Sequence, residues 1–264
     1  MSIKNLKCTV AYKGTAYSGW QKQQNFPTVQ GLIDYSLFKL FGGEIKTTGA
    51  SRTDAGVHAM GQVFNFCVET KIEPDGVRKM LNGLLPQDIR IKDCVEVDYN
   101  FSSRHNAREK FYRYMVYNRS TMPPLYNDIA WHVYDRLDPE KIHEILHLFK
   151  GKKNYFTFSA SSDTKRYERE IRSIKIKVSG PWIIMDFRGR SFLYNMIRRM
   201  AAAFVDYARG TTNLADVEKM FEINDRSNLT STAPAHGLQL VKIIYHKHNP
   251  HQNFAEQNSE IVEG

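Results

Sequence analysis

The chain has 264 residues, of which 42% are hydrophobic and 25% are charged, as in an ordinary globular protein. This length is enough to bury a core as one large domain or two small ones. No stretch approaches the ~20 apolar residues that a membrane span needs. Residues 1–7 lack the apolar core of a signal peptide, so we expect a cytoplasmic location and no membrane partner.

The net charge is the stronger clue to a partner. The formal charge is +9, and residues 249–264 hold three glutamates but neither lysine nor arginine. We expect this end to be a disordered tail, which leaves a still more basic body. A basic body favours a polyanionic partner, with nucleic acid first, although lysines scattered only for solubility would give the same composition.

In chain order, the first part of the sequence predicts strand, helix, strand, helix and strand. Thr28 is placed as an N-cap and Gly42-Gly43 as a stop for the first helix, and Pro74 opens the second. The expected ranges are 4–12, 29–41, 62–68, 74–85 and 89–97.

The second part predicts a similar mixture. A strand is expected over 111–117, then a helix from Asp138-Pro139 to Gly151, a hairpin of 171–178 with 183–187, helices capped by Ser191 and Asn213, and a strand over 238–245. We therefore expect two α+β halves, residues 1–104 and 105–248, with the boundary near 100–108.

One run stands out as a candidate site, from Gly49 to His58. It places Asp54 between small residues and two glycines, with Arg52 two positions upstream. The run is too polar and glycine-rich for a helix and predicts a shaped loop. A nearby cation would keep the Asp54 carboxylate ionised and lower its pKa. A plain turn, in which Asp54 bonds backbone amides and Arg52 is solvated, is the alternative.

A second candidate segment, residues 104–114, mixes basic and aromatic side chains. Arg104, Arg108 and Lys110 are suited to phosphates, and the rings to unpaired bases. Alternation along a strand puts Tyr112 and Tyr114 on one face. A half-buried strand whose basic side chains extend to water would show the same mixture of residues.

Two more basic groups follow, within residues 165–177 and 188–199. The first has the pattern of a solvated face and is at most an RNA backbone contact. In the second, Arg198 follows Met196 on an apolar helix. It either points outward or turns toward a buried carboxylate, which its fixed charge would hold ionised.

Metal and cofactor signatures are absent from the sequence. Three widely spaced cysteines give no Cys-x-x-Cys pair, so neither a zinc site nor a disulfide framework is indicated. His143 and His147 have helical spacing but lack the acidic residue of a metalloprotease pattern. Without a dinucleotide or phosphate-loop motif, we expect an enzyme that uses no cofactor and no metal.

Taken together, several motifs resemble the tRNA pseudouridine synthase A (TruA-type) family along almost the whole chain. They stand in order at 14–23 with 28–30, 52–58 with 61–63, 81–89, 101–107 with 112–114, 192–198 and 233–238. The resemblance implies an α+β pseudouridine synthase fold, with an antiparallel sheet core, flanking helices and two similar halves around a basic cleft. It also implies a homodimer that acts on tRNA without a cofactor.

The implied reaction converts uridine into pseudouridine in the anticodon stem-loop, on its 3′ side at tRNA positions 38–40. The N-glycosidic bond breaks, the base rotates, and its C5 joins the ribose C1′.

The resemblance also assigns roles to residues. Asp54 is the catalytic carboxylate, either a nucleophile or a base on the sugar. Arg198 pairs with it, Arg52 helps to flip the base, and Tyr112 packs on the base and serves the C5 deprotonation. The predicted RNA-binding residues are Arg52, His58, Gln62, Arg104, Arg108, Lys110 and Tyr112.

The chain also departs from the family pattern. Alanines stand at 201–203 where the family usually has glycine, and the stretch 165–170 is unusual. We expect these departures to affect the choice of the target uridine more than the chemistry of the reaction.

Overall fold

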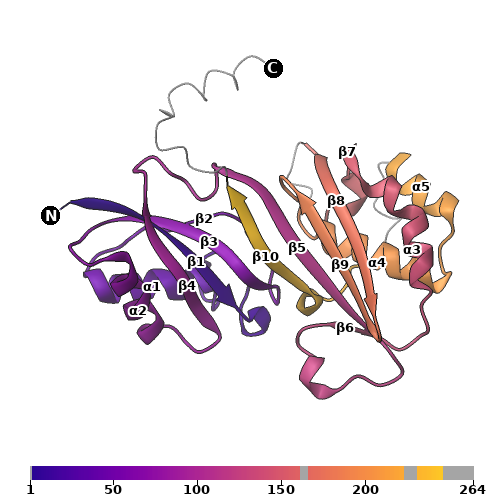
Figure 1. The fold of residues 1–264 in the computed structure, drawn as a ribbon, viewed down its shortest axis with the longest axis horizontal. Coiled ribbons are helices and arrows are strands. Elements are labelled where there is room, and N and C mark those ends of the chain that lie inside the picture. The colour runs from indigo at the N-terminus through magenta and orange to yellow at the C-terminus, as the bar shows by residue number, and fades with distance from the viewer. Residues whose placement is uncertain (1, 161–165, 223–230, 246–264) are drawn as a thin grey trace, which may run out of the picture.

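The computed structural model describes residues 2–160, 166–222 and 231–245, and in them ten strands form one twisted sheet (Figure 1). The strands are β1 (Ile3–Tyr12), β2 (Thr48–Gly49), β3 (His58–Glu69), β4 (Ile89–Val97), β5 (Ala107–Asn118), β6 (Trp131–Val133), β7 (Gly151–Asn154), β8 (Glu168–Ser179), β9 (Trp182–Gly189) and β10 (Leu238–Tyr245). The helices are α1 (Val29–Phe41), α2 (Pro74–Leu84), α3 (Pro139–Ile145), α4 (Met196–Arg209) and α5 (Leu214–Glu222). The expected tail, 249–264, and Lys165 lie outside the described residues.

The sheet joins the two expected halves into one layer. Its order is β4-β1-β3-β10-β5-β9-β8-β7, with β2 on β3 and β6 on β5. The last strand, β10, returns to lie between β3 of the first half and β5 of the second, as Figure 1 shows near the middle of the molecule. The α+β class is confirmed, but the sheet is mixed, because the β3–β10 and β5–β6 pairings are parallel.

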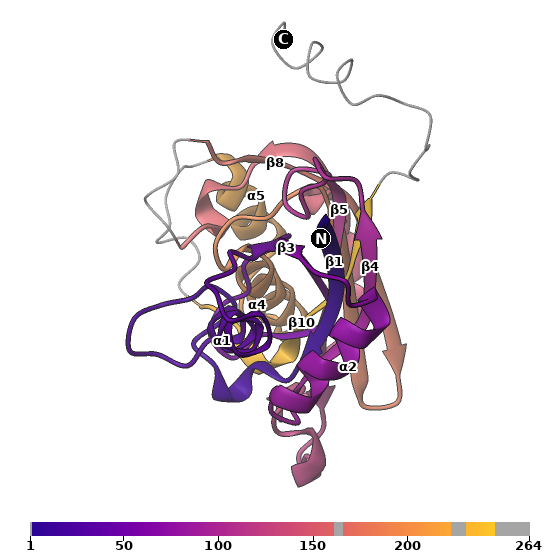
Figure 2. The same ribbon diagram turned by 90° about the vertical axis from the view of Figure 1, so that its left-hand side faces the viewer.

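The helices cover the sheet and bury its apolar side. Figure 2 shows α1 and α4 on the same side of the sheet. The ring of Phe187 on β9 stacks on Phe204 of α4, with centroids 6.1 Å apart and planes 4° apart. In the first half, Trp20 lies between Tyr12 and Phe64, with centroids about 6 Å from each, so the core reaches directly beneath the glycine-rich loop.

Several predicted boundaries are confirmed by capping contacts. The hydroxyl of Thr28 accepts a hydrogen bond from the Gly31 amide at 3.2 Å and caps α1. Gly42, with φ of 73°, ends α1 in the left-handed conformation that favours glycine. The side chain of Asn213 accepts a bond from the Asp216 amide and caps α5.

Three predicted elements need correction. Ser191 does not cap a helix, since α4 begins at Met196 after Asn195, whose φ is 58°; residues 191–195 form a loop over the cleft instead. The strand expected from Gln62 begins at His58. The helix that begins at Pro139 is α-helical only to Ile145 and continues as a 3-10 turn, Leu146–Phe149.

Candidate active site

A cleft of about 1340 Å³ lies where the two halves meet. Its walls include residues 47–54, the start of β5, residues 190–197 at and before the start of α4, and Arg169 of β8. Of the predicted site residues, Arg52, Asp54, Arg104, Lys110 and Tyr112 line this cleft. The structure thus brings residues more than 50 positions apart into one basic, concave site.

The loop that carries Asp54 is shaped by glycine and by close packing. The Val57 amide donates to the Asp54 carbonyl at 3.1 Å, and Gly56 has φ of 79°, which is the requirement of a type II turn at this position. From below, the Trp20 amide donates to the Thr53 carbonyl at 3.0 Å. Gly14 allows the closest approach, because a Cβ there would lie 2.0 Å from the Val57 carbonyl oxygen.

Asp54 is a partly buried carboxylate, and among the described residues its side chain has one charged neighbour, Arg198. Its Oδ2 lies 3.9 Å from Nη1 of Arg198. Burial raises the pKa of Asp54 above its usual value, and Arg198 partly opposes this. The expected net lowering of this pKa is therefore wrong, because desolvation outweighs the attraction of the neighbouring cation.

Arg198 lies in the first turn of α4, and its side chain turns into the molecule. Its Nε donates to the Ala233 carbonyl at 2.7 Å, and its Nη1 donates to Oδ1 of Asn195 at 2.9 Å. Two fixed acceptors thus orient the guanidinium toward Asp54. This settles the direction of the side chain in favour of the inward alternative.

Tyr112 lies on the wall of the cleft beside Asp54. Its hydroxyl is hydrogen bonded to Oγ of Ser51 at 2.9 Å, and its ring meets the edge of Phe192 with centroids 5.3 Å apart. Burial raises the pKa of Tyr112 to about 12, with a smaller contribution from Asp54. The phenol is therefore protonated at neutral pH.

His58 and Gln62 lie beneath the loop and not among the cleft-lining residues. Nδ1 of His58 accepts from the Gly14 amide at 3.0 Å, and its Nε2 lies 3.0 Å from the His236 carbonyl, so both ring nitrogens are engaged. Gln62 is fully buried and donates to the Ser51 carbonyl. Their placement supports the loop, in contrast to the RNA contact expected for them.

The remaining predicted RNA-binding residues differ in whether they line the cleft. Arg52 is exposed, with Nε 3.2 Å from Oε1 of Gln21. Arg104 and Lys110 line the cleft, whereas Arg108 is exposed at an irregularity in the β5–β10 pairing and lies outside the lining. Only part of the basic segment therefore faces the site.

Sequence reasoning did not single out the residues that hold the loop from behind. Ser51 and Thr53 bond to Tyr112 and Tyr12, and Gly14 leaves room for Val57. The motif 14–23 contained the signal, since a Gly-rich segment far from the catalytic run indicates a close backbone approach.

In the described ranges no three histidine, cysteine or acidic side chains gather in a way that could hold a metal ion. Over the same ranges, no helix is both long and apolar enough to cross a membrane.

Comparison with known proteins identifies the family. A family model described as tRNA pseudouridine synthase matches residues 9–106 and 145–246. The chain belongs to the tRNA pseudouridine synthase family. The tRNA pseudouridine synthase A of Caldicellulosiruptor bescii is 36% identical over 244 residues, which cover 92% of this chain and 100% of that protein. The tRNA pseudouridine synthase A of Thermodesulfovibrio yellowstonii is 34% identical over 252 residues, covering 91% and 99%.

The similarity to solved structures is weaker. The archaeal box H/ACA sRNP Nop10-Cbf5 complex matches 76% of this chain and 44% of that chain, at 12% identity and a TM-score of 0.33. Membership of the tRNA pseudouridine synthase family rests on the sequence matches, and it makes this chain an RNA isomerase that acts on uridine in tRNA.

Proposed function

We propose that this enzyme isomerises uridines on the 3′ side of the tRNA anticodon stem-loop, at positions 38–40, and that Asp54 is its catalytic residue. The observation that carries the proposal is the Asp54 carboxylate, which faces the cleft with Arg198 at 3.9 Å. Among the described residues, no side chain or amide donates a hydrogen bond to this carboxylate, so its oxygens are open to a substrate.

A uridine in the stack must leave it to reach Asp54, because the carboxylate lies inside the cleft. In this proposal Arg52, which is exposed and lines the cleft, helps the base out of the stack and fills the vacated space. Tyr112 then packs on the base, and the edge-to-face contact with Phe192 holds the Tyr112 ring in place. Residues 190–197, which include Phe192, also line the cleft.

The chemistry is an isomerisation that balances without any other reactant. The bond between N1 and C1′ breaks, the base turns, and C5 bonds to C1′; the C5 proton is lost and N1 gains one. The ionised Asp54 acts either on C1′ as a nucleophile or on the sugar as a base. Tyr112, protonated at neutral pH, has to give up its own proton before it can accept one from C5.

The test is incubation with an unmodified tRNA transcript, followed by mapping of pseudouridine after carbodiimide treatment. We expect new signals on the 3′ side of the anticodon stem-loop with the wild type and none with Asp54→Asn. Asp128→Asn, an exposed aspartate paired with Lys13, is the matched control and should behave as wild type. New signals elsewhere in the tRNA alone would overturn the assigned target, and signals with Asp54→Asn would overturn the assigned residue.

Two further expectations stay predictions, the homodimer and the cytoplasmic location. An RNA-binding module without catalysis is the alternative function. It is disfavoured because Asp54, Arg198 and Tyr112 converge on one site, which binding alone does not require.

A further inference from the structure

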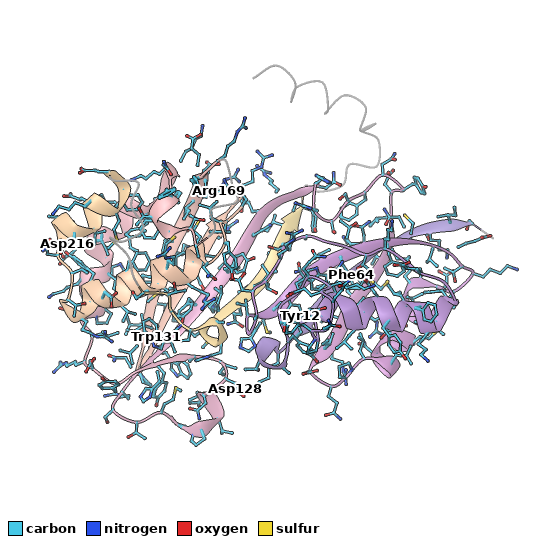
Figure 3. All side chains as sticks on the ribbon, turned by 180° about the vertical axis from the view of Figure 1, so that it is seen from behind. Tyr12, Phe64, Asp128, Trp131, Arg169 and Asp216 are labelled. Atoms are coloured by element: carbon cyan, nitrogen blue, oxygen red, sulfur yellow. The ribbon has the colours of Figure 1, made fainter. Side chains whose placement is uncertain are left out.

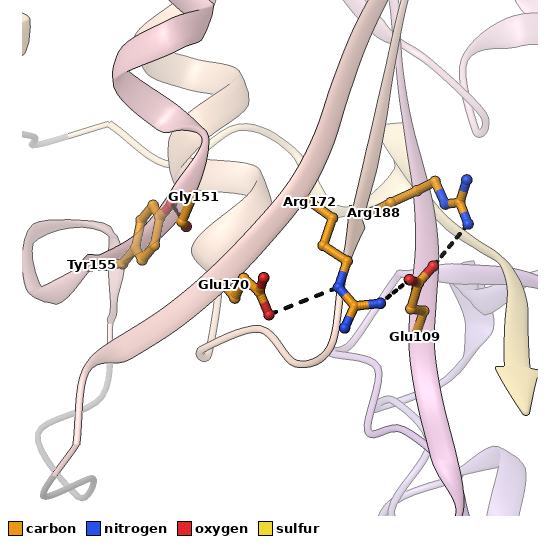
Figure 4. A network of polar contacts seen from close by, with 6 residues as sticks. All are labelled: Glu109, Gly151, Tyr155, Glu170, Arg172 and Arg188. Carbon is orange, nitrogen blue, oxygen red and sulfur yellow. Dashed lines mark hydrogen bonds and ion pairs between the residues drawn. The ribbon is translucent and has the colours of Figure 1, made fainter. Parts of the chain in front are cut away.

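Three arginines on the side of the sheet away from the cleft are paired with carboxylates. Arg172 and Arg188 both bond to the carboxylate of Glu109 (Figure 4), the latter at 2.8 Å. Arg113 binds Asp186 there through two hydrogen bonds of 2.7 and 2.9 Å. These cations are neutralised within the protein.

The cleft side of the same strands is different. Lys110 alternates with Glu109 on β5 and so projects with Tyr112 toward the cleft. It stands opposite Gly189 of β9, which stands opposite Ile171 of β8. Arg169, two residues before Ile171, therefore lies on the same face, and it lines the cleft together with Lys110 and Arg104.

These three cations have no acidic partner among the described residues. The Nε of Arg169 is buried without a hydrogen bond, while its Nη1 donates to the carbonyls of Arg166 and Glu168 at 3.0 and 2.6 Å. Figure 3 shows Arg169 on the C-terminal half, on the side of the sheet that carries α4. The side chains of Arg104 and Lys110 form no hydrogen bond or ion pair with any described residue.

The protein therefore holds like charges together at a free-energy cost. Burial, together with smaller contributions from Arg104 and Arg169, lowers the pKa of Lys110 to about 8. Burial also lowers the pKa of Arg169. Beside Lys110, the facing residues Gly189 and Ile243 of the neighbouring strands carry no charge. Unpaired, partly desolvated cations of this kind are compensated when an anion binds.

We propose that Arg104, Lys110 and Arg169 form one preorganised site for a single phosphate group of the RNA backbone. The proposal rests on the proposed function for the identity of the RNA. A phosphodiester accepts charge-assisted hydrogen bonds from all three side chains. The site lies on the strand that carries Tyr112, so it fixes the backbone of the RNA relative to the base that Tyr112 contacts.

The test measures the affinity of an unmodified tRNA transcript for Lys110→Met, Arg169→Met and the double variant. Lys242→Met is the matched control, because Lys242 is an exposed basic residue of the neighbouring strand β10 outside the cleft lining. We expect each single variant to bind at least about tenfold more weakly, as for the loss of one charge-assisted contact, and Lys242→Met to bind as wild type.

Salt dependence separates one phosphate from several. The slope of log affinity against log salt should fall by at most about 0.7–0.9 in either single variant, the value for one phosphate contact. The double variant should fall by no more than that. A loss twice as large in the double variant would overturn the single shared phosphate, and single variants that bind as tightly as Lys242→Met would overturn the site.

Protonation provides a second readout. Above about pH 8 the free enzyme loses the Lys110 proton, so wild-type affinity should fall between pH 7 and 9. Lys110→Arg should keep its affinity over this range, since a guanidinium stays charged. Parallel profiles for wild type and Lys110→Arg would exclude the Lys110 ammonium from phosphate binding.

The unfolding temperature of each variant checks that a variant which binds more weakly is still folded. Removing an unpaired, partly buried cation should leave the unfolding temperature of Lys110→Met unchanged or higher; a lower temperature would contradict the unpaired state. The proposed function fails separately, through absent pseudouridine at the expected positions, whatever the affinities of these variants are.

Discussion

At the scale of single residues, the site depends on the balance between burial and one cation at Asp54. Burial raises the pKa of this carboxylate and Arg198 lowers it. The guanidinium is held by Ala233 and Asn195, so its distance from Asp54 is set by the protein. Arg198 is thus a positioning residue that keeps Asp54 ionised.

Replacing Arg198 with methionine should shift the acid limb of the rate profile. Without the cation, the pKa of Asp54 rises further, and the ionised form is lost at a higher pH. We measure the single-turnover rate at saturating tRNA as a function of pH. In Arg198→Met, the pH at which this rate reaches half its maximum on the acid side should be about one unit higher than in the wild type. Arg190→Met, which removes an exposed cation of the same cleft, should leave the limb in place, and an unmoved limb in Arg198→Met would contradict the pairing.

His58 should make the stability of the enzyme depend on pH. Burial lowers the pKa of His58, and its Nδ1 must stay unprotonated to accept from Gly14. The unfolded chain takes up this proton below about pH 6.5, whereas the folded chain resists it, so stability is lost as the pH falls below that value.

Urea unfolding at pH 7.5 and 5.5 measures this effect. The free energy of unfolding should fall more on acidification in the wild type than in His58→Gln. His143→Gln, which alters an exposed histidine of α3, should retain the wild-type difference. If His58→Gln also retained it, His58 would not be the group responsible.

At the scale of elements, the loop 50–57 is positioned by a segment that precedes it by about 40 residues. Gly14 allows the backbone to pass the Val57 carbonyl, and the Trp20 amide binds Thr53. The loop that carries Asp54 therefore depends on the turn after β1 as much as on its own glycine.

Gly14→Ala should displace the loop. A Cβ 2.0 Å from a backbone oxygen cannot be accommodated without movement, and we expect a loss of about 1–3 kcal/mol in stability, together with a fall in activity. Gly43→Ala is the control, since a Cβ there meets nothing within 4 Å. Equal stability and activity in the two variants, by urea unfolding and pseudouridine assay, would show that the contact is not limiting.

Most elements followed from the sequence because their signals are local. Caps such as Thr28 and Asn213, and stops such as Gly42, act within one turn of chain. The helix predicted from Ser191 failed because the spacing of Phe192 and Met196 fits a helix, whereas Phe192 in fact packs on Tyr112 of another strand. A contact between distant segments leaves no period in the sequence.

The site followed from the sequence only in part, for the same reason. Asp54 and Arg52 stand out in one run, but the pairing of Arg198 with Asp54 came from the family resemblance. The inward placement of His58 and Gln62 depends on Gly14 and Ser51, which lie on other segments. The raised pKa of Asp54 depends on burial, which the motif does not encode.

At the scale of the whole molecule, β10 makes the two halves one body. By pairing with β3 and β5, it fixes the loop that carries Asp54 relative to the strand that carries Tyr112. On the back face Arg113, Arg172 and Arg188 are paired with carboxylates, whereas Arg104, Lys110 and Arg169 of the cleft have no acidic partner among the described residues. This arrangement predicts binding spread over many contacts and chemistry confined to one carboxylate.

The central claim is that Asp54 performs the isomerisation, and the release of tritium from tRNA labelled at C5 of uridine tests it most directly. Every turnover breaks a C5–hydrogen bond, so the wild type should release label until its target uridines are converted. Asp54→Asn should bind this tRNA with near wild-type affinity and release no label above background. Release by Asp54→Asn at even a few per cent of the wild-type rate would contradict the assignment of Asp54 as the catalytic residue.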